Sequence, residues 1–169
     1  MTVTDCADAH SAPATVVADL GRWAKMQERT DTPSAALWCA AYNGDTALVS
    51  RLIAEGVDIN VWDRHGRNAL TLACERGHLE VVRLLVNSGA WVDPFEDYDG
   101  YMTPLMCAAQ TGRIEIVEHL LDHGANPALF GGPSRATAEH YARIDSPSSP
   151  FLAAILRRAE DEWRKTHRS

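Results

Sequence analysis

The sequence has no apolar run that is long enough to cross a membrane. A membrane-spanning helix needs about 20 consecutive apolar residues, and no stretch of the 169 residues approaches that length. The first residues also lack the basic start and hydrophobic core of a secretory signal. Acidic Asp5 and Asp8 argue against an organelle transit peptide. We therefore expect a soluble protein of the cytoplasm or another reducing intracellular compartment.

Positive charge is also scarce. The formal net charge is −7, and lysine and arginine gather only near the C-terminus, where acidic residues are interspersed with them. Binding to nucleic acid requires a positive surface that neutralises phosphates, and anionic membrane surfaces make a similar demand. The sequence thus predicts neither a nucleic-acid nor a membrane partner.

Recognisable catalytic motifs are missing as well. The chain has no glycine-rich phosphate loop, no His-Glu-x-x-His segment and no Gly-x-Ser-x-Gly segment. Its seven histidines show no spacing that points to a nucleophile or a general base. We expect no catalytic residues, no metal site and no cofactor, so the chain is not predicted to be an enzyme.

The chain does contain a ten-residue sequence motif that occurs three times. Residues 35–44 read AALWCAAYNG, residues 68–77 read NALTLACERG and residues 103–112 read TPLMCAAQTG, at spacings of 33 and 35 residues. Each copy runs into an apolar helical pattern that stops at a glycine: Gly56, Gly89 and Gly124. A repeat of this length indicates one supersecondary unit stacked on copies of itself.

Each unit carries the signals of two helices. Thr103 is a suitable N-cap, and Pro104 suits the first helical position, where its missing N–H costs no hydrogen bond. In the first copy the cap position is alanine, so Thr32 and Pro33 are expected to start that helix about one turn earlier. Apolar residues at helical spacing then predict a second helix with one buried face, as at Leu79, Val82, Leu85 and Val86. The closing glycines suit the left-handed position that ends many helices.

This pattern resembles the ankyrin repeat, whose first helix begins T-P-L-H-x-A, over roughly residues 32–156. The resemblance implies an all-α solenoid of stacked helix–turn–helix units with projecting β-hairpin-like turns. A degraded fourth copy begins at Thr137 and keeps His140 and Ala142 in register, with Glu139 in place of leucine. The implied boundaries are a disordered segment at 1–13 and a repeat domain at 14–169, divided into a capping helix at 14–30, repeats at 31–63, 64–97 and 98–131, a degraded repeat at 132–158 and a charged tail at 159–169.

The segment 14–30 and the cysteines each need an interpretation. The amphipathic helix predicted at 14–30 is expected to cover the exposed end of the stack, and a partner-binding helix is the alternative. Cysteines fall in the first helices of successive units, at Cys39, Cys74 and Cys107. In the register of the resemblance, Cys39 and Cys107 lie two units apart, about 20 Å at the usual helix spacing, which is too far for a disulfide. We interpret these cysteines as small packing residues.

The resemblance also implies protein recognition through a concave side, formed by the turns at 57–67, 90–102 and 125–136 and by the first helices. Its variable contact positions correspond here to Trp38, Tyr42, Asn43, Asp63, Arg64, His65, Arg67, Thr71, Glu75, Arg76, Tyr98, Asp99, Tyr101, Met102, Met106, Gln110 and Thr111. Trp38 and Tyr42 lie four residues apart, so one helical face presents both. Aromatic residues and arginine are enriched at the residues that dominate binding energy.

Two further groups lie on or near this side. Trp62, Trp91 and Phe95 either contact a partner or pack between neighbouring turns. Glu96, Asp97 and Asp99 form an acidic edge that suits a basic partner segment, and a solvated loop is the alternative.

Together these features predict a small non-catalytic protein, monomeric on its own, that binds another protein as an adaptor, assembly factor or inhibitor. The alternatives are a dedicated enzyme inhibitor or antidote and a structural subunit of a larger complex. An enzyme or small-molecule binder with a pocket in the groove is a further alternative.

Overall fold

The computed structural model describes residues 33–63, 65–93, 101–145 and 149–167. These ranges contain eight α-helices: α2 (Pro33–Asn43), α3 (Thr46–Ala54), α4 (Ala69–Arg76), α5 (Leu79–Asn87), α6 (Pro104–Gln110), α7 (Ile114–Asp122), α8 (Ala138–Asp145) and α9 (Ser149–Thr166). In the same ranges, β-structure is limited to one bridge between Gly131 and Ala136. The fold is all-α, as predicted.

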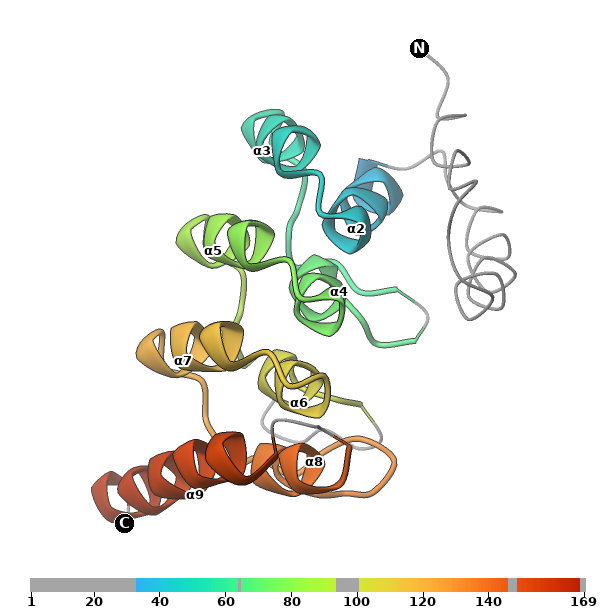
Figure 1. Ribbon diagram of the computed structural model, residues 1–169. Coiled ribbons are helices and arrows are strands. Elements are labelled where there is room, and N and C mark those ends of the chain that lie inside the picture. Colours follow the sequence, from blue (N-terminus) through green and yellow to red (C-terminus); the bar gives the residue numbers. More distant parts are fainter. Residues whose placement is uncertain (1–32, 64, 94–100, 146–148, 168–169) are drawn as a thin grey trace.

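The helices form two parallel columns (Figure 1). The first helices α2, α4, α6 and α8 stack in one column, and the second helices α3, α5, α7 and α9 stack in the other. We call the pairs α2–α3, α4–α5, α6–α7 and α8–α9 units 1 to 4. We call the connections 57–67, 90–102 and 125–136 turns 1, 2 and 3. Their described parts project past the first helices, away from the second helices. The arrangement confirms a solenoid of stacked helix pairs.

The first helices begin where the sequence predicts. The side chain of Asn68 accepts a hydrogen bond from the backbone N–H of Thr71 at 2.9 Å, which caps α4. The hydroxyl of Thr103 accepts from the N–H of Met106 at 3.1 Å, and Pro104 is the first residue of α6. These bonds satisfy backbone donors that the helix itself leaves unpaired.

The closing glycines also take their predicted conformation. Gly56, Gly89 and Gly124 have φ angles of +81°, +91° and +85°. This left-handed region is open to glycine at little cost and is strained for residues with a side chain. Each unit therefore ends at its glycine, and the next turn starts from the same geometry.

A continuous apolar core runs through the stack. Leu37, Leu70 and Leu105 of the first helices are buried, and so are Val82 and Leu85 of α5. Alanine pairs in α2 and α6, and Ala73-Cys74 in α4, are buried as well. Such small residues allow neighbouring helices to pack closely. Because each unit buries its apolar faces against its neighbours, stability is shared along the stack.

The last unit, α8–α9, carries ion pairs between charged side chains. Glu139 takes the position of the buried leucines and pairs with Arg157 at 2.7 Å between its Oε1 and Nη2. The charged tail predicted at 159–169 forms the C-terminal part of α9 as far as Thr166. Ion pairs between residues four apart, Arg158 with Glu162 and Glu160 with Arg164, support this part of the helix.

Several predictions concern residues outside the described ranges. These are the segments 1–13 and 14–30, Arg64, Phe95, Tyr98 and the acidic residues Glu96, Asp97 and Asp99. Among the helices of the described ranges, none combines the length and the apolar character that crossing a bilayer demands.

Candidate protein-binding surface

Two of the predicted contact residues lie inside the protein. Thr71 and Met106 are each 1% exposed. The Thr71 hydroxyl accepts a hydrogen bond from the N–H of Asn68 at 2.9 Å, and the Met106 sulfur accepts from the N–H of Thr103 at 3.5 Å. The prediction that they face a partner is wrong. The third residue of each helix turns back toward the N-cap and completes a reciprocal capping pair.

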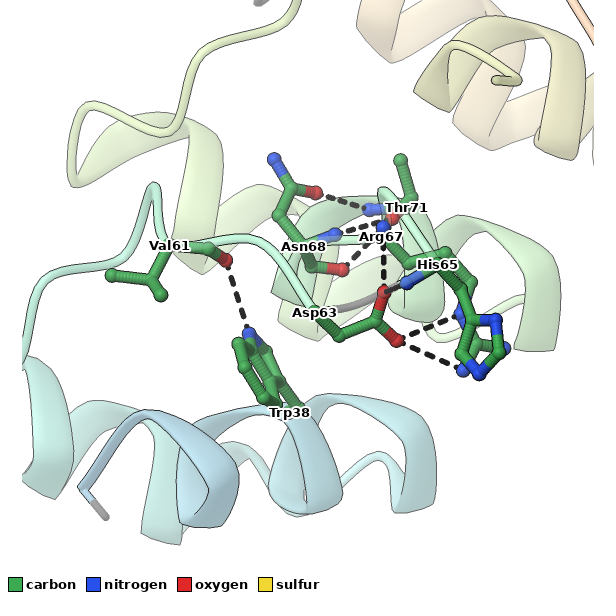
Figure 2. A network of polar contacts seen from close by, with 7 residues as sticks. All are labelled: Trp38, Val61, Asp63, His65, Arg67, Asn68 and Thr71. Carbon is green, nitrogen blue, oxygen red and sulfur yellow. Dashed lines mark hydrogen bonds and ion pairs between the residues drawn. The ribbon is translucent and has the colours of Figure 1, made fainter. Parts of the chain in front are cut away.

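Trp38 occupies the same repeat position in α2 and also acts within the protein. Its indole N–H donates to the carbonyl of Val61 at 3.1 Å, which joins α2 to turn 1 (Figure 2). The ring is half-buried and packs against the core. Contact between Trp38 and a partner stays a prediction, and the structure gives this residue a separate role in stability.

Turn 1 is organised around the buried carboxylate of Asp63. Its Oδ1 accepts from the N–H groups of His65 and Arg67 at 2.8 and 2.9 Å. Its Oδ2 accepts from Nε and Nη2 of Arg67 at 3.0 and 2.9 Å (Figure 2). Asp63 was predicted as a contact residue, but its carboxylate is occupied by these bonds. They leave His65 exposed at the tip of the turn and Arg67 half-buried.

Tyr42 and Arg76 form a pair between units 1 and 2. The guanidinium carbon of Arg76 lies 4.5 Å from the centroid of the Tyr42 ring, which is the geometry of a cation–π interaction. Nε2 of His78 donates to the Tyr42 carbonyl at 2.9 Å. The His78 ring also lies against Gly44, where an added Cβ would approach its Nδ1 to 2.6 Å. Unit 2 thus holds both the ring and the backbone of Tyr42.

The remaining predicted residues continue this side of the stack. Glu75 and Gln110 occupy the repeat position of Tyr42, and Asn43 and Thr111 occupy that of Arg76. Asn43 and Glu75 are exposed, Gln110, Thr111 and Met102 are half-buried, and Tyr101 is exposed beside Gly66. We define the inner surface as Tyr42, Asn43, His65, Arg67, Glu75, Arg76, Tyr101, Met102, Gln110 and Thr111.

Sequence reasoning missed Ile144. It lies 34 residues after Gln110, at the position of Tyr42 in the degraded fourth unit, and it is 64% exposed. Extending the repeat register into the fourth copy would have identified it. Of the tryptophans whose role was left open, Trp91 is exposed and Trp62 is half-buried.

Cys107 of α6 interacts electrostatically with Glu75 and Arg67 of the inner surface. Burial and, to a lesser extent, nearby Glu75 raise the pKa of Cys107 to about 12, against the opposing effect of Arg67. Such a thiol stays protonated and is a poor nucleophile. Across the described ranges, no three His, Cys, Asp or Glu side chains gather in a way that could hold a metal.

A cavity of about 490 Å³ lies elsewhere, between the end of α7 and the extension of α9. Leu121, Pro127, Ile155 and Trp163 contribute to its apolar lining, and Arg158 and Glu162 stand beside them. Because these residues come from the second helices and turn 3, the cavity is separate from the inner surface.

A family model described as ankyrin repeats, in three copies, matches residues 20–96 and 37–130. The chain belongs to the ankyrin-repeat family. Proteins of this family are built from stacked units that generally serve in binding other proteins.

Three relatives illustrate where such repeats occur. The chain is 38% identical over 99 residues to "Ankyrin repeat and KH domain-containing protein mask-1" of Caenorhabditis elegans, which covers 59% of this chain and 4% of that protein. It is 41% identical over 81 residues to mouse "Ankyrin repeat domain-containing protein 63", and the match covers 46% of this chain and 20% of that protein. It is 33% identical over 100 residues to mouse "Glutaminase liver isoform, mitochondrial", and the match covers 59% of this chain and 16% of that protein. The chain thus spans at most a fifth of these three relatives.

Proposed function

We propose that this protein binds a partner protein through its inner surface and has no catalytic activity of its own. The Tyr42–Arg76 pair is the observation that carries the proposal. Tyrosine and arginine are enriched among the residues that dominate binding energy at protein interfaces. Because Arg76 and His78 already hold Tyr42 in place, a partner would meet an ordered side chain. Little conformational entropy would then be lost on binding.

The relatives support a binding role in a general way. One relative is named for ankyrin repeats beside a KH domain, and another, which this chain matches over 100 residues, is named as an enzyme, glutaminase. Repeats that occur in proteins of such different kinds suit a module that supplies contacts. We place the chain among adaptors, assembly factors or inhibitors. A tight stoichiometric complex that abolishes the activity of one enzyme would favour the dedicated inhibitor, and co-purification in a fixed ratio would favour the structural subunit.

The cysteines support a proposal for the cellular setting. Cys39, Cys74 and Cys107 form no disulfide with one another, and burial raises the pKa of Cys74 well above its usual value. Free thiols are typical of proteins from reducing compartments. We therefore place the protein in the cytoplasm or a similar compartment. A basic partner segment, predicted from Glu96, Asp97 and Asp99, remains part of the proposal.

The test starts by identifying the partner through affinity purification and mass spectrometry. Its affinity is then measured for the wild type and for Tyr42→Ala and Arg76→Ala. We expect each variant to raise Kd by at least about fivefold, since truncation of such residues commonly costs more than about 1 kcal/mol. The double variant should lose less binding free energy than the sum of the two single losses, because the Tyr42 ring and the Arg76 guanidinium act as a pair.

Arg83→Ala is the matched control. Arg83 is an arginine with a local contact, to Glu80 at 3.8 Å, but it is exposed and lies on α5 in the column of second helices. We expect its affinity to match the wild type. The proposal fails if Tyr42→Ala and Arg76→Ala fold normally and bind as tightly as Arg83→Ala.

A further inference from the structure

A side-chain amide joins turn 1 to turn 2. Asn60 of turn 1 accepts a hydrogen bond at Oδ1 from the N–H of Trp91 at 2.9 Å. Its Nδ2 donates to the carbonyl of Gly89 at 3.3 Å. The amide therefore uses one acceptor and one donor to hold the start of the next turn.

Asp93 stands at the equivalent place one unit later. Asn60 follows its closing glycine, Gly56, by four residues, and Asp93 follows Gly89 by four residues. Oδ2 of Asp93 accepts from the N–H of Asn126 at 2.6 Å, which repeats the bond between Asn60 and Trp91. Asn126 follows Gly124 by two residues, as Trp91 follows Gly89. In this register the carbonyl of Gly124 corresponds to that of Gly89, to which the Asn60 amide donates.

That second oxygen, Oδ1 of Asp93, is buried and has no hydrogen-bond partner among the described residues. A carboxylate oxygen cannot donate to a carbonyl, so the ionised form makes one of the two bonds that the asparagine makes. A buried acceptor without a donor is unfavourable, and more so when it is charged. The protonated carboxyl has an O–H that matches the donor position of the Asn60 amide.

We propose that Asp93 is a proton-dependent tie between turns 2 and 3, in which its carboxyl O–H donates to the carbonyl of Gly124. Above the titration range the carboxylate holds turn 3 by the N–H of Asn126 alone. After proton uptake from solvent it holds turn 3 by two bonds, as Asn60 holds turn 2 at every pH.

The electrostatic surroundings agree with this geometry. Burial raises the pKa of Asp93 from 3.8 to about 6, and the hydrogen bond from Asn126 opposes the rise. The charged groups on the neighbouring second helices include Arg83 of α5 and His119, Asp122 and His123 of α7. None of these four is among the causes of the shift. Glu96, Asp97 and Asp99 of turn 2 lie outside the described residues.

The sign of the effect follows from linkage. The folded-state pKa lies above the ordinary value, so the folded chain binds more protons than the unfolded chain between these two values. The contribution of Asp93 to stability is greatest at low pH and is lost as pH rises through about 6. Between pH 5 and pH 7.5 this lowers the folding equilibrium constant by about tenfold.

The first measurement compares wild type and Asp93→Asn by urea unfolding from pH 5 to pH 7.5. Asparagine restores both bonds without a proton, so the variant should lack this contribution. We expect the ratio of wild-type to variant folding constants to fall about tenfold across the range. The side-chain carboxyl of Asp93 should titrate near 6 by carbon-13 NMR in the folded wild type. A ratio that stays constant, or a carboxyl that titrates near 4, would overturn the proposal.

Asn60→Asp is the matched control. It places a carboxyl at the equivalent site between turns 1 and 2, so it should introduce a second pH-dependent step of the same sign. An Asn60→Asp variant whose stability relative to wild type does not change with pH would also overturn the proposal. The NMR titration decides the case even if Asp93→Asn were to fold poorly, because it uses the wild-type chain.

Discussion

Replacing Asn68 with threonine is expected to stabilise the protein. Asn68 is 0% exposed, and its Oδ1 caps α4. Its Nδ2 is buried without a hydrogen-bond partner in the part of the chain that the structure describes, and Figure 2 shows it pointing away from the other polar groups. At the equivalent position of unit 3, Thr103 caps α6 with a hydroxyl and carries no amide. Asn68→Thr keeps the acceptor and removes the unpaired donor.

The size of the effect follows from three contributions. An unsatisfied buried polar group costs about 1–3 kcal/mol, and its removal is the favourable term. Threonine is a slightly weaker N-cap than asparagine, by a few tenths of a kcal/mol. It also has one heavy atom fewer, so a small void opposes the gain by up to about 1 kcal/mol. The net expectation is a gain of about 1 kcal/mol, which raises Tm by about 2–4 °C for a chain of this size.

The assay is urea and thermal unfolding of wild type, Asn68→Thr and the control Asn68→Ala. Alanine removes the unpaired donor together with the cap acceptor, leaving the N–H of Thr71 without its partner. It should destabilise by about 1 kcal/mol. If threonine destabilises as much as alanine, the amide nitrogen contributes to stability and the reasoning is refuted.

Three further predictions concern packing. Leu85→Asp places an unpaired charge at a fully buried site of unit 2. We expect the variant to be unfolded at 25 °C, with no cooperative transition in circular dichroism, and a folded variant would contradict the assigned register. Trp38→Phe should cost about 1 kcal/mol and Trp38→Ala about 3 kcal/mol in chemical unfolding, and equal losses would argue against a packing role for the ring. Gly44→Ala should cost at least about 1 kcal/mol more than Gly56→Ala, because both glycines have positive φ but only Gly44 lies against the His78 ring. Matching unfolding midpoints for these two variants would show that the ring can move aside.

Local signals predicted the helices well. Asn68 and Thr103 cap helices, Pro33 and Pro104 begin them, and Gly56 takes a left-handed backbone, as the sequence indicated. Each of these features depends on a few consecutive residues. The backbone hydrogen bonds and the φ angle concerned are formed within one helix end, so a short window of sequence contains the relevant information.

The direction of side chains was less predictable. Trp38, Thr71 and Met106 were assigned to the binding side because the corresponding family position varies. Thr71 and Met106 instead complete caps within their own helices, and Trp38 bonds to Val61 of the next turn. The charged tail predicted at 159–169 belongs to α9 as far as Thr166, where ion pairs between residues four apart support the helix. Residue type alone did not show which of these contacts would form.

The sequence by itself determined the repeating unit, its caps, its closing glycines and the all-α class. Only the tertiary structure decided that Arg76 covers Tyr42, which precedes it by 34 residues, and that Asp93 meets Asn126 across a unit boundary. The physical reason is that contacts between units depend on how far each helix pair is shifted and rotated against the next. That placement results from packing the whole core, so no single stretch of residues specifies it.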